Sequence, residues 1–220
     1  MIRVHIFCEG QTEETFINEL LYNYFIQGGI FINPLQIPTN KHVKGGISCY
    51  GKIKWHVEKK CKEDKTSWVT TMFDFYAFPY KDISGLNIKL GMSSIEKSKA
   101  IIEAFQQDIA QSNFFANLIV HEFEGLLFSS PQTFNCWFDE PKIVDDLTKI
   151  RDKFESPEHI NDGNTTAPSK RILKICKDYE KVNHGSLIAL DIGLDIIRTE
   201  CLIFNQWIKH IEGLSNVNIT

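Results

Sequence analysis

Up to residue 128, the sequence alternates between short apolar runs and amphipathic segments, and no other feature limits the fold as strongly. Residues 2–8 form an apolar, partly β-branched run that predicts a buried strand, and Glu9 and Gly10 form the turn that ends it. A helix is predicted from Thr12 to the glycines at 28–29, because acids occupy its first turn and apolar residues recur at helical spacing. This alternation favours βα units and a mainly parallel sheet.

Two later strands are predicted to end in carboxylates. Residues 67–74 form a β-prone run that predicts a central strand ending at Asp74. Residues 114–128 predict another strand, near whose end apolar and acidic residues alternate. Because successive side chains of a strand point to opposite faces, Glu122 and Glu124 are expected to project from the same face. These two glutamates are therefore a candidate pair.

Two helices and one weaker strand complete the predicted α/β unit. Residues 30–37 are apolar but interrupted by Pro34, so they predict an edge strand or an extended connection. Residues 51–61 predict an amphipathic surface helix with lysines outside its apolar face. Ser93 and Glu96 have the spacing of a capping box and predict the start of another helix.

After Pro131 the strand signal disappears and only helical patterns remain. Helices are predicted at residues 134–138, at 141–154, from 168 onward, and in several pieces across 187–213. We therefore predict an α/β core at residues 1–130 and a helical C-terminal portion at residues 131–220 that packs on it.

Composition is typical of a globular protein with one compact core, since 43% of the 220 residues are hydrophobic. The first apolar run meets a carboxylate at Glu9, so it does not predict a secretory signal. Charges interrupt every candidate for a membrane span, which takes about 20 apolar residues. We expect a soluble, cytoplasmic protein that does not insert into membranes. The six cysteines include no CxxC pair, so we expect reduced thiols and no structural zinc.

Charge is distributed unevenly along the chain. The formal net charge of −4 does not favour sequence-independent wrapping of nucleic acid, which depends on lysine and arginine contacts to phosphates. Between Lys41 and Lys65, however, eight lysines stand against three acids. These lysines form either a local basic face or, as is more usual for such runs, the solvated side of an exposed helix.

Carboxylates follow three of the predicted strands: Glu9 the first, Asp74 the third, and Glu122 with Glu124 the fourth. In an open parallel sheet these ends lie at one edge, where functional crevices form. Oxygen ligands of this kind suit Mg²⁺, which keeps waters for a phosphate substrate. Each acid also has an ordinary explanation, as a turn or helix-start residue, a loop cap, or a member of an ion pair. Acids brought this close would repel without a cation or a basic partner.

Four short motifs, in this order, resemble a known bacterial family. The first is the run from Val4 to Glu13, which is similar to the strand followed by Glu-Gly-x-Thr-Glu that opens Toprim-like proteins. The others are residues 70–76, residues 121–128 and residues 168–172. They are spread over nearly the whole chain, and together they resemble the family called domain of unknown function 4276.

This resemblance implies a Toprim-like fold, Mg²⁺-assisted cleavage of nucleic acid, and a role in bacterial defence, often beside an ABC-type or related ATPase. It assigns Glu9 and Asp74 to metal binding. One position departs from the Toprim pattern, because Tyr76 stands where a second aspartate is expected. Glu124, with Glu122 as a further ligand or general base, is the candidate replacement. Whether one or two metal ions bind stays open.

Lys170 and Arg171 lie near the start of a helix that Pro168 is expected to open, a suitable place to approach an anionic substrate. Surface ion pairs with the acids of residues 145–152 explain these two cations equally well. Lys181 has a weaker signal still, because a lysine at a helix end usually stabilises the helix dipole.

Three functions remain open from the sequence. The first is a metal-dependent phosphodiesterase acting on DNA or RNA, in which Glu9, Asp74 and Glu124 bind Mg²⁺ or Mn²⁺. In it, Lys170 contacts the developing negative charge, and Lys170 and Arg171 bind the substrate. The second is a non-catalytic Toprim-like effector or sensor subunit that docks on a partner ATPase, and the third is a hydrolase of small phosphate substrates. A homodimer is compatible with the sequence, although no apolar stripe is clearly left over to form one.

Overall fold

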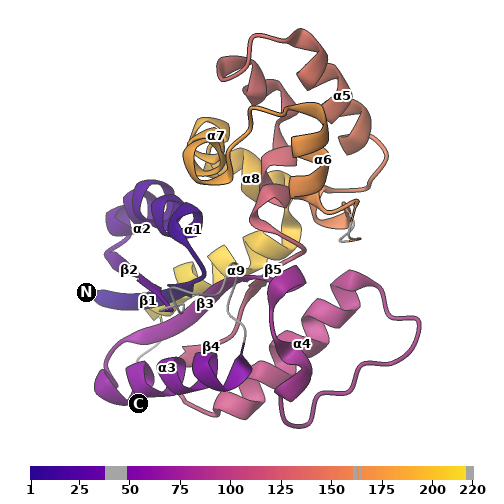
Figure 1. Ribbon diagram of the computed structural model, residues 1–220. Coiled ribbons are helices and arrows are strands. Elements are labelled where there is room, and N and C mark those ends of the chain that lie inside the picture. The colour runs from indigo at the N-terminus through magenta and orange to yellow at the C-terminus, as the bar shows by residue number, and fades with distance from the viewer. Residues whose placement is uncertain (38–48, 161–162, 164, 217–220) are drawn as a thin grey trace.

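The computed structural model describes residues 1–37, 49–160, 163 and 165–216. In these ranges one sheet is flanked by helices, and further helices form the C-terminal portion (Figure 1). The predicted α/β fold with a parallel sheet and a helical C-terminal portion is therefore confirmed. None of the helices in the same ranges combines the length and the apolar character that crossing a bilayer requires.

The sheet has five strands in the order β2-β1-β3-β4, and β5 also pairs with β3. Their bounds are β1 (Ile2–Cys8), β2 (Ile30–Gln36), β3 (Trp68–Asp74), β4 (Phe114–Phe115) and β5 (Leu118–Ile119). Every pair is parallel, so the carboxyl ends of the strands lie at one edge. β2 is an edge strand of the sheet. Pro34, which lacks an N–H group to donate to a further strand, is tolerated there.

Alternate side chains of the central strands enter two separate apolar clusters. In β1, Ile6 and Cys8 belong to one cluster and Phe7 to the other. In β3, Met72 belongs to the first cluster and Phe73 to the second. Both faces of these strands are thus covered, which explains why they form nearly continuous apolar runs in the sequence.

Helices cover the two faces of the sheet (Figure 1). On one face lie α3 (Tyr50–Glu63) and α4 (Ser94–Ile109), whose apolar residues share a cluster with Phe7. On the other lie α1 (Gln11–Phe16) and α2 (Tyr22–Gln27), which a π-helical turn connects. The carboxyl edge of the sheet therefore lies between two helical layers.

Two predictions about helix surfaces can be compared with the structure. Ser93 caps α4 as predicted, since its hydroxyl accepts a hydrogen bond from the N–H of Glu96 at 3.2 Å.

Lysines of α3 form ion pairs with nearby acids: Lys54 with Asp108 at 2.9 Å, Lys59 with Glu63 at 3.6 Å, and Lys62 with Glu58 at 3.1 Å. Lys41 and Lys44 of the same lysine-rich run lie outside the described residues. The described part of that run is an exposed helix whose lysines pair with acids.

The continuous strand predicted over residues 114–128 is wrong. The structure has two short strands there, β4 and β5, because Asn117 interrupts the ladder: its Nδ2 donates to the carbonyl of Thr71 at 3.2 Å. The chain then turns at His121, whose φ of 65° is incompatible with an extended strand. Residues Phe123–Ser129 form a 3₁₀ helix, so Glu122 and Glu124 do not project from a strand.

The C-terminal portion is helical among the described residues. Its α-helices are α5 (Pro141–Arg151), α6 (Pro168–Ile175), α7 (Ser186–Ile192), α8 (Leu194–Glu200) and α9 (Leu202–Gly213). Gly193, at φ 83°, separates α7 from α8 in a conformation that favours glycine. α9 packs on the sheet, where the Trp207 indole donates to the hydroxyl of Thr70 at 3.1 Å. The domain boundary at residue 130 stays a prediction.

Replacing Asn117 with alanine should destabilise the fold by about 1–3 kcal/mol, because the carbonyl of Thr71 loses its buried partner. Urea unfolding of the wild type and the variant measures this difference. Asn87→Ala is the matched control, since Asn87 is exposed and its loss should change the free energy of unfolding by less than about 0.5 kcal/mol. Equal losses in both variants would contradict the role given to Asn117.

Candidate functional site

Carboxylates reach the same edge of the sheet from separate segments of the chain. Glu9 follows β1, Asp74 ends β3, and Glu122 and Glu124 follow β5. The N–H of Phe123 donates to Asp74 Oδ1 at 2.8 Å and so fixes the start of the 3₁₀ helix to the end of β3. The structure therefore brings the predicted acids of β3 and of the segment after β5 together.

A lysine from the C-terminal portion lies among these acids. Lys181 Nζ is 3.4 Å from Asp74 Oδ2, 3.4 Å from Glu124 Oε2 and 3.5 Å from Glu13 Oε1. We call these four side chains the Lys181 cluster. The three acids are buried, with Glu13 3%, Asp74 7% and Glu124 0% exposed, whereas 41% of the Lys181 side chain is exposed. The cluster is thus a buried group of carboxylates beneath a cation that reaches solvent.

Glu13 enters the cluster through the local geometry at the start of α1. Its Oε2 accepts a hydrogen bond from the N–H of Gly10 at 3.0 Å, while its Oε1 faces Lys181. A Cβ atom at Gly10 would lie 3.3 Å from Glu13 Oε2, so the absent side chain at Gly10 eases this bond. Glu13 lies in the first turn of α1, whereas Glu9 precedes that helix.

Lys181 begins a π-helical turn, Lys181–Gly185, that packs closely on α1. The hydroxyl of Thr12 donates to the carbonyl of Lys181 at 3.5 Å. A Cβ atom at Gly185 would lie 2.9 Å from the Tyr179 hydroxyl and 3.2 Å from Thr12 Cγ2. Glycine at position 185 therefore permits the close approach that places Lys181 over the acids.

Glu9 and Glu122 flank the cluster. Burial raises the pKa of Glu9, and the charge of Glu13 raises it further, whereas Lys181 opposes the shift. The carboxylate of Glu122 accepts a hydrogen bond from the N–H of Ser169 at 3.0 Å, in the first turn of α6. Glu122 thus connects the site to the helix that carries Lys170 and Arg171.

Burial is the largest influence on protonation within the cluster. It raises the pKa of Asp74 well above its usual value, an effect that Lys181 opposes and Glu13 increases. Burial also raises the pKa of Glu124, again against Lys181. For Lys181, burial lowers the pKa, but the neighbouring carboxylates outweigh it and the pKa rises. The ammonium therefore stays charged and favours the ionised form of the acids.

Three buried polar atoms of the site lack hydrogen bonds. Among the described residues, neither oxygen of Glu124 nor the hydroxyl of Tyr179 has a hydrogen-bond partner, although Glu124 forms its ion pair with Lys181. Burial raises the pKa of Tyr179, and the charge of Glu124 raises it further. Buried polar atoms in proteins are normally paired with protein groups, water or an ion. These atoms are therefore candidates to bind a further cation or ordered water.

The donor set suits a hard divalent cation, which prefers carboxylate oxygens. The carboxylates at this edge are Glu9, Glu13, Asp74, Glu122 and Glu124. In the described ranges, no group of three or more His, Cys, Asp or Glu side chains already has the arrangement needed to hold a metal ion. Asp74 and Glu124 form ion pairs with Lys181 instead, so the predicted ligand set stays a prediction.

Lys170 and Arg171 follow Ser169 in α6, beyond the hydrogen bond that connects Glu122 to this helix. Lys170 is exposed on α6. Arg171 donates through Nε to the carbonyl of Thr166 at 2.6 Å, and its guanidinium lies 5.4 Å from the centre of the Phe154 ring. Arg171 lines a pocket between α5 and α6 whose lining contains none of the Lys181 cluster. Their predicted role in binding a substrate stays a prediction.

Sequence reasoning did not select Glu13, and it gave Lys181 only a weak signal. A signal for Glu13 was present, because a glutamate in the first turn of a helix that starts directly after β1 stays near the same edge. Nothing in the sequence connects Lys181 with the acids, since it is 107 residues from Asp74 along the chain. Only the packing of the C-terminal portion on α1 brings the lysine to the acids.

Comparisons with known proteins give two matches. A family model described as "Domain of unknown function (DUF4276)" matches residues 8–212. A solved structure of the C-terminal region of the OLD protein from Xanthomonas campestris pv. campestris is similar, with 15% sequence identity, a TM-score of 0.44, and coverage of 96% of this chain and 95% of that chain. No curated protein matches the sequence.

Replacing Lys181 with methionine should destabilise the protein in a pH-dependent way. Asp74 and Glu124 have raised pKa values in the folded state, so folding takes up protons and stability falls as the pH rises from about 4 through the raised values. Without the ammonium these pKa values rise further, which extends the loss to higher pH. We expect a deficit of about 1–3 kcal/mol at about pH 8, allowing for the partial exposure of Lys181, and a smaller one at about pH 5.

Urea unfolding at both pH values measures this effect. Lys177→Met is the matched control, because Lys177 is exposed on the same portion of the chain, and its loss should have the same small effect at each pH. A Lys181→Met deficit that does not depend on pH would contradict the electrostatic role of the lysine.

Proposed function

This chain belongs to the DUF4276 family, a domain of unknown function, and we propose that it is a metal-dependent phosphodiesterase that hydrolyses nucleic acid. The Lys181 cluster carries the proposal: acids from α1, β3 and the segment after β5 meet one ammonium at the carboxyl edge of a parallel sheet. Such edges are where open α/β sheets bind their ligands. Carboxylates grouped there suit phosphoryl transfer, which depends on a divalent cation.

The proposed metal ligands are the acids predicted from the sequence, together with the acid that lies beside them in the cluster: Glu9, Asp74, Glu124 and Glu13. Mg²⁺ or Mn²⁺ would supply Lewis-acid stabilisation of phosphoryl charge and an activated water. Glu122 is proposed as a further ligand or as the general base, and its bond to the N–H of Ser169 fixes its orientation.

Lys181 is the proposed contact to the phosphate. Its ammonium is partly exposed, and its raised pKa keeps it protonated. When another cation neutralises Asp74 and Glu124, this ammonium becomes available to an oxygen of the substrate, where it stabilises developing negative charge. The sequence alone suggested Lys170 for this contact, and Lys181 is now the stronger candidate because it already lies among the acids.

A second candidate function is a non-catalytic subunit that docks on a partner ATPase, in a bacterial defence system. Two observations favour it. Lys181 already forms ion pairs with the buried acids and offsets part of their charge, as in a structural ion-pair network. Tyr76, at the position expected for a second aspartate, is 43% exposed and offers a phenol in place of a carboxylate.

Activity of the purified protein on DNA, RNA and nucleotides, with Mg²⁺ or Mn²⁺ added, distinguishes the two functions. We expect metal-dependent hydrolysis, with a loss of at least about 100-fold in kcat for Asp74→Asn, Glu124→Gln and Lys181→Met. Glu19→Gln is the matched control, because Glu19 is an exposed acid in the helical segment that follows β1. It should keep wild-type activity.

Hydrolysis that survives in Asp74→Asn and Glu124→Gln would place the activity elsewhere or in a contaminant. Hydrolysis that is absent from the wild type, with and without a candidate partner ATPase, would favour the docking subunit.

Metal binding can be tested without turnover. Mn²⁺ that binds only the folded state should raise the thermal unfolding midpoint of the wild type, with a stabilisation of about 2.7 kcal/mol at a hundredfold excess over Kd. Asp74→Asn should lose most of this increase, because one ligand is neutral, whereas Glu19→Gln should retain it. An identical Mn²⁺ effect in the wild type and Asp74→Asn would contradict the proposed site.

A further inference from the structure

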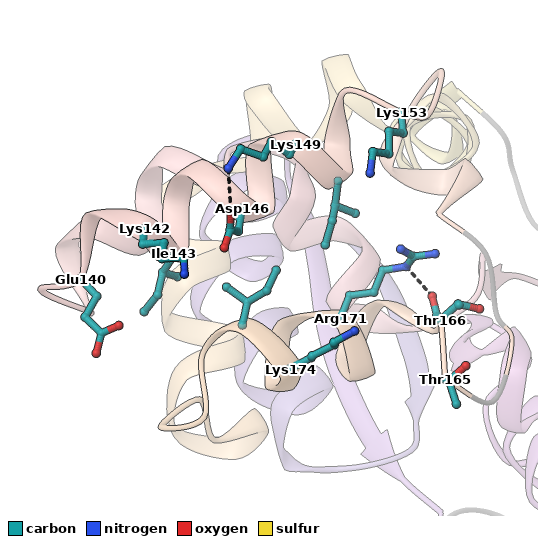
Figure 2. Close-up of a pocket in the computed structure, with 12 residues that line it drawn as sticks. Glu140, Lys142, Ile143, Asp146, Lys149, Lys153, Thr165, Thr166, Arg171 and Lys174 are labelled. Carbon is teal, nitrogen blue, oxygen red and sulfur yellow. Dashed lines mark hydrogen bonds and ion pairs between the residues drawn. The ribbon is translucent and has the colours of Figure 1, made fainter.

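A second polar site lies outside the Lys181 cluster, between α5 and α6. It is a pocket of about 610 Å³ whose lining comes from these two helices, from Glu140 and Lys153 just outside the ends of α5, and from Thr165 and Thr166 (Figure 2). Figure 2 shows side chains of both helices directed toward the space between them, with Lys153, in the turn after α5, extending toward Arg171 of α6. The pocket therefore has two walls that carry cations.

Positive charge is concentrated in this pocket. Its charged lining residues are the cations Lys142, Lys149, Lys153, Arg171 and Lys174 and the acids Glu140 and Asp146. Among the described lining residues, five cations against two acids leave an excess of three positive charges, although the whole chain has a formal net charge of −4. Local charge opposite in sign to that of the protein favours an anionic ligand at this place.

Regular helix geometry places these cations together. Lys142 and Lys149 lie seven residues apart, two turns along one face of α5, and Lys153 follows in the turn after that helix. Arg171 and Lys174 lie one turn apart on α6. Arg171 is held in place by its bond to the carbonyl of Thr166 at 2.6 Å and by the Phe154 ring. The pocket is therefore formed by ordered elements, with one cation fixed in position.

The lysines of α3 differ from the lysines of the pocket in their ion pairs. Lys59 and Lys62 are also exposed, but each forms an ion pair with an acid of its own helix, at 3.6 Å and 3.1 Å. In the pocket, Lys149 pairs with Asp146 at 2.8 Å, and the ion pairs of the described ranges include none with Lys142, Lys153 or Lys174. The charge of the pocket is therefore less compensated than that of the lysine-rich helix.

α6 connects the pocket to the candidate active site. Its first turn donates from the N–H of Ser169 to the carboxylate of Glu122, and Arg171 follows two residues later. For an anionic polymer that presents one phosphate to the carboxylate edge, α6 therefore offers a path along which a further phosphate can reach the pocket. A small phosphate ester has no second phosphate that could reach the pocket.

We propose that the pocket between α5 and α6 binds the sugar-phosphate backbone of a nucleic acid strand that extends from the Lys181 cluster. The choice of nucleic acid rests on the proposed function. Contacts of Lys and Arg to the backbone position a strand without reading its sequence, and their strength depends on salt. The pocket thus increases affinity and sets the path of the strand, while the carboxylates act on it.

Fluorescence anisotropy with labelled single-stranded DNA and RNA, in the presence of EDTA to prevent cleavage, tests this site. The variant is the double substitution Lys153→Gln and Lys174→Gln, and the matched control is Lys59→Gln with Lys62→Gln. We expect the pocket variant to bind at least about tenfold more weakly, and the slope of log affinity against log salt to fall by about 1.4 for two lost contacts. The control should bind like the wild type.

All four substituted lysines are exposed, so both variants should unfold thermally like the wild type. Equal affinity and equal salt slope in the pocket variant and the wild type would overturn the proposal. So would a wild type that binds inorganic phosphate in the pocket but neither oligonucleotide. Weaker binding by the pocket variant, in a protein without hydrolytic activity, would support the backbone site while the proposed enzyme activity fails.

Discussion

Three buried carboxylates share one ammonium group at the edge of the sheet, and the arrangement of the chain around them follows from this contact. Burying an ionised carboxylate costs several kcal/mol unless a partner compensates it, and Glu13, Asp74 and Glu124 are all buried. Lys181 provides the compensation at 3.4–3.5 Å. Lys181 belongs to the C-terminal portion. The three buried acids therefore have this partner only when that portion packs on α1.

The same packing gives the molecule two regions of opposite charge. Acids gather at the carboxyl ends of the strands, and cations gather between α5 and α6. The bond between Ser169 and Glu122 connects the two regions through the first turn of α6. A protein with a net negative charge can in this way present a positive surface beside an acidic site. The positive surface suits an anionic polymer, and the acidic site suits a divalent cation.

The sequence predicted elements well where the signal was local. The capping box of Ser93 and Glu96 involves residues three apart, so it does not depend on the rest of the fold. The predicted strand over residues 114–128 was wrong for the opposite reason. Its alternating pattern is compatible with a strand, but the side chain of Asn117 bonds to β3 and His121 adopts a left-handed conformation. Both depend on tertiary context, which overrides local preference.

The sequence by itself determined that carboxylates follow the strands of a parallel sheet, because apolar runs and the acids that end them are neighbours in the chain. This placed Glu9, Asp74 and Glu124 among the candidate residues. Only the tertiary structure decided that Lys181 lies between Asp74 and Glu124 and that Glu13 turns toward it. The physical reason is that a charge interaction depends on distance in space. Asp74 and Lys181 are separated by 107 positions in the sequence, and no local pattern specifies their contact.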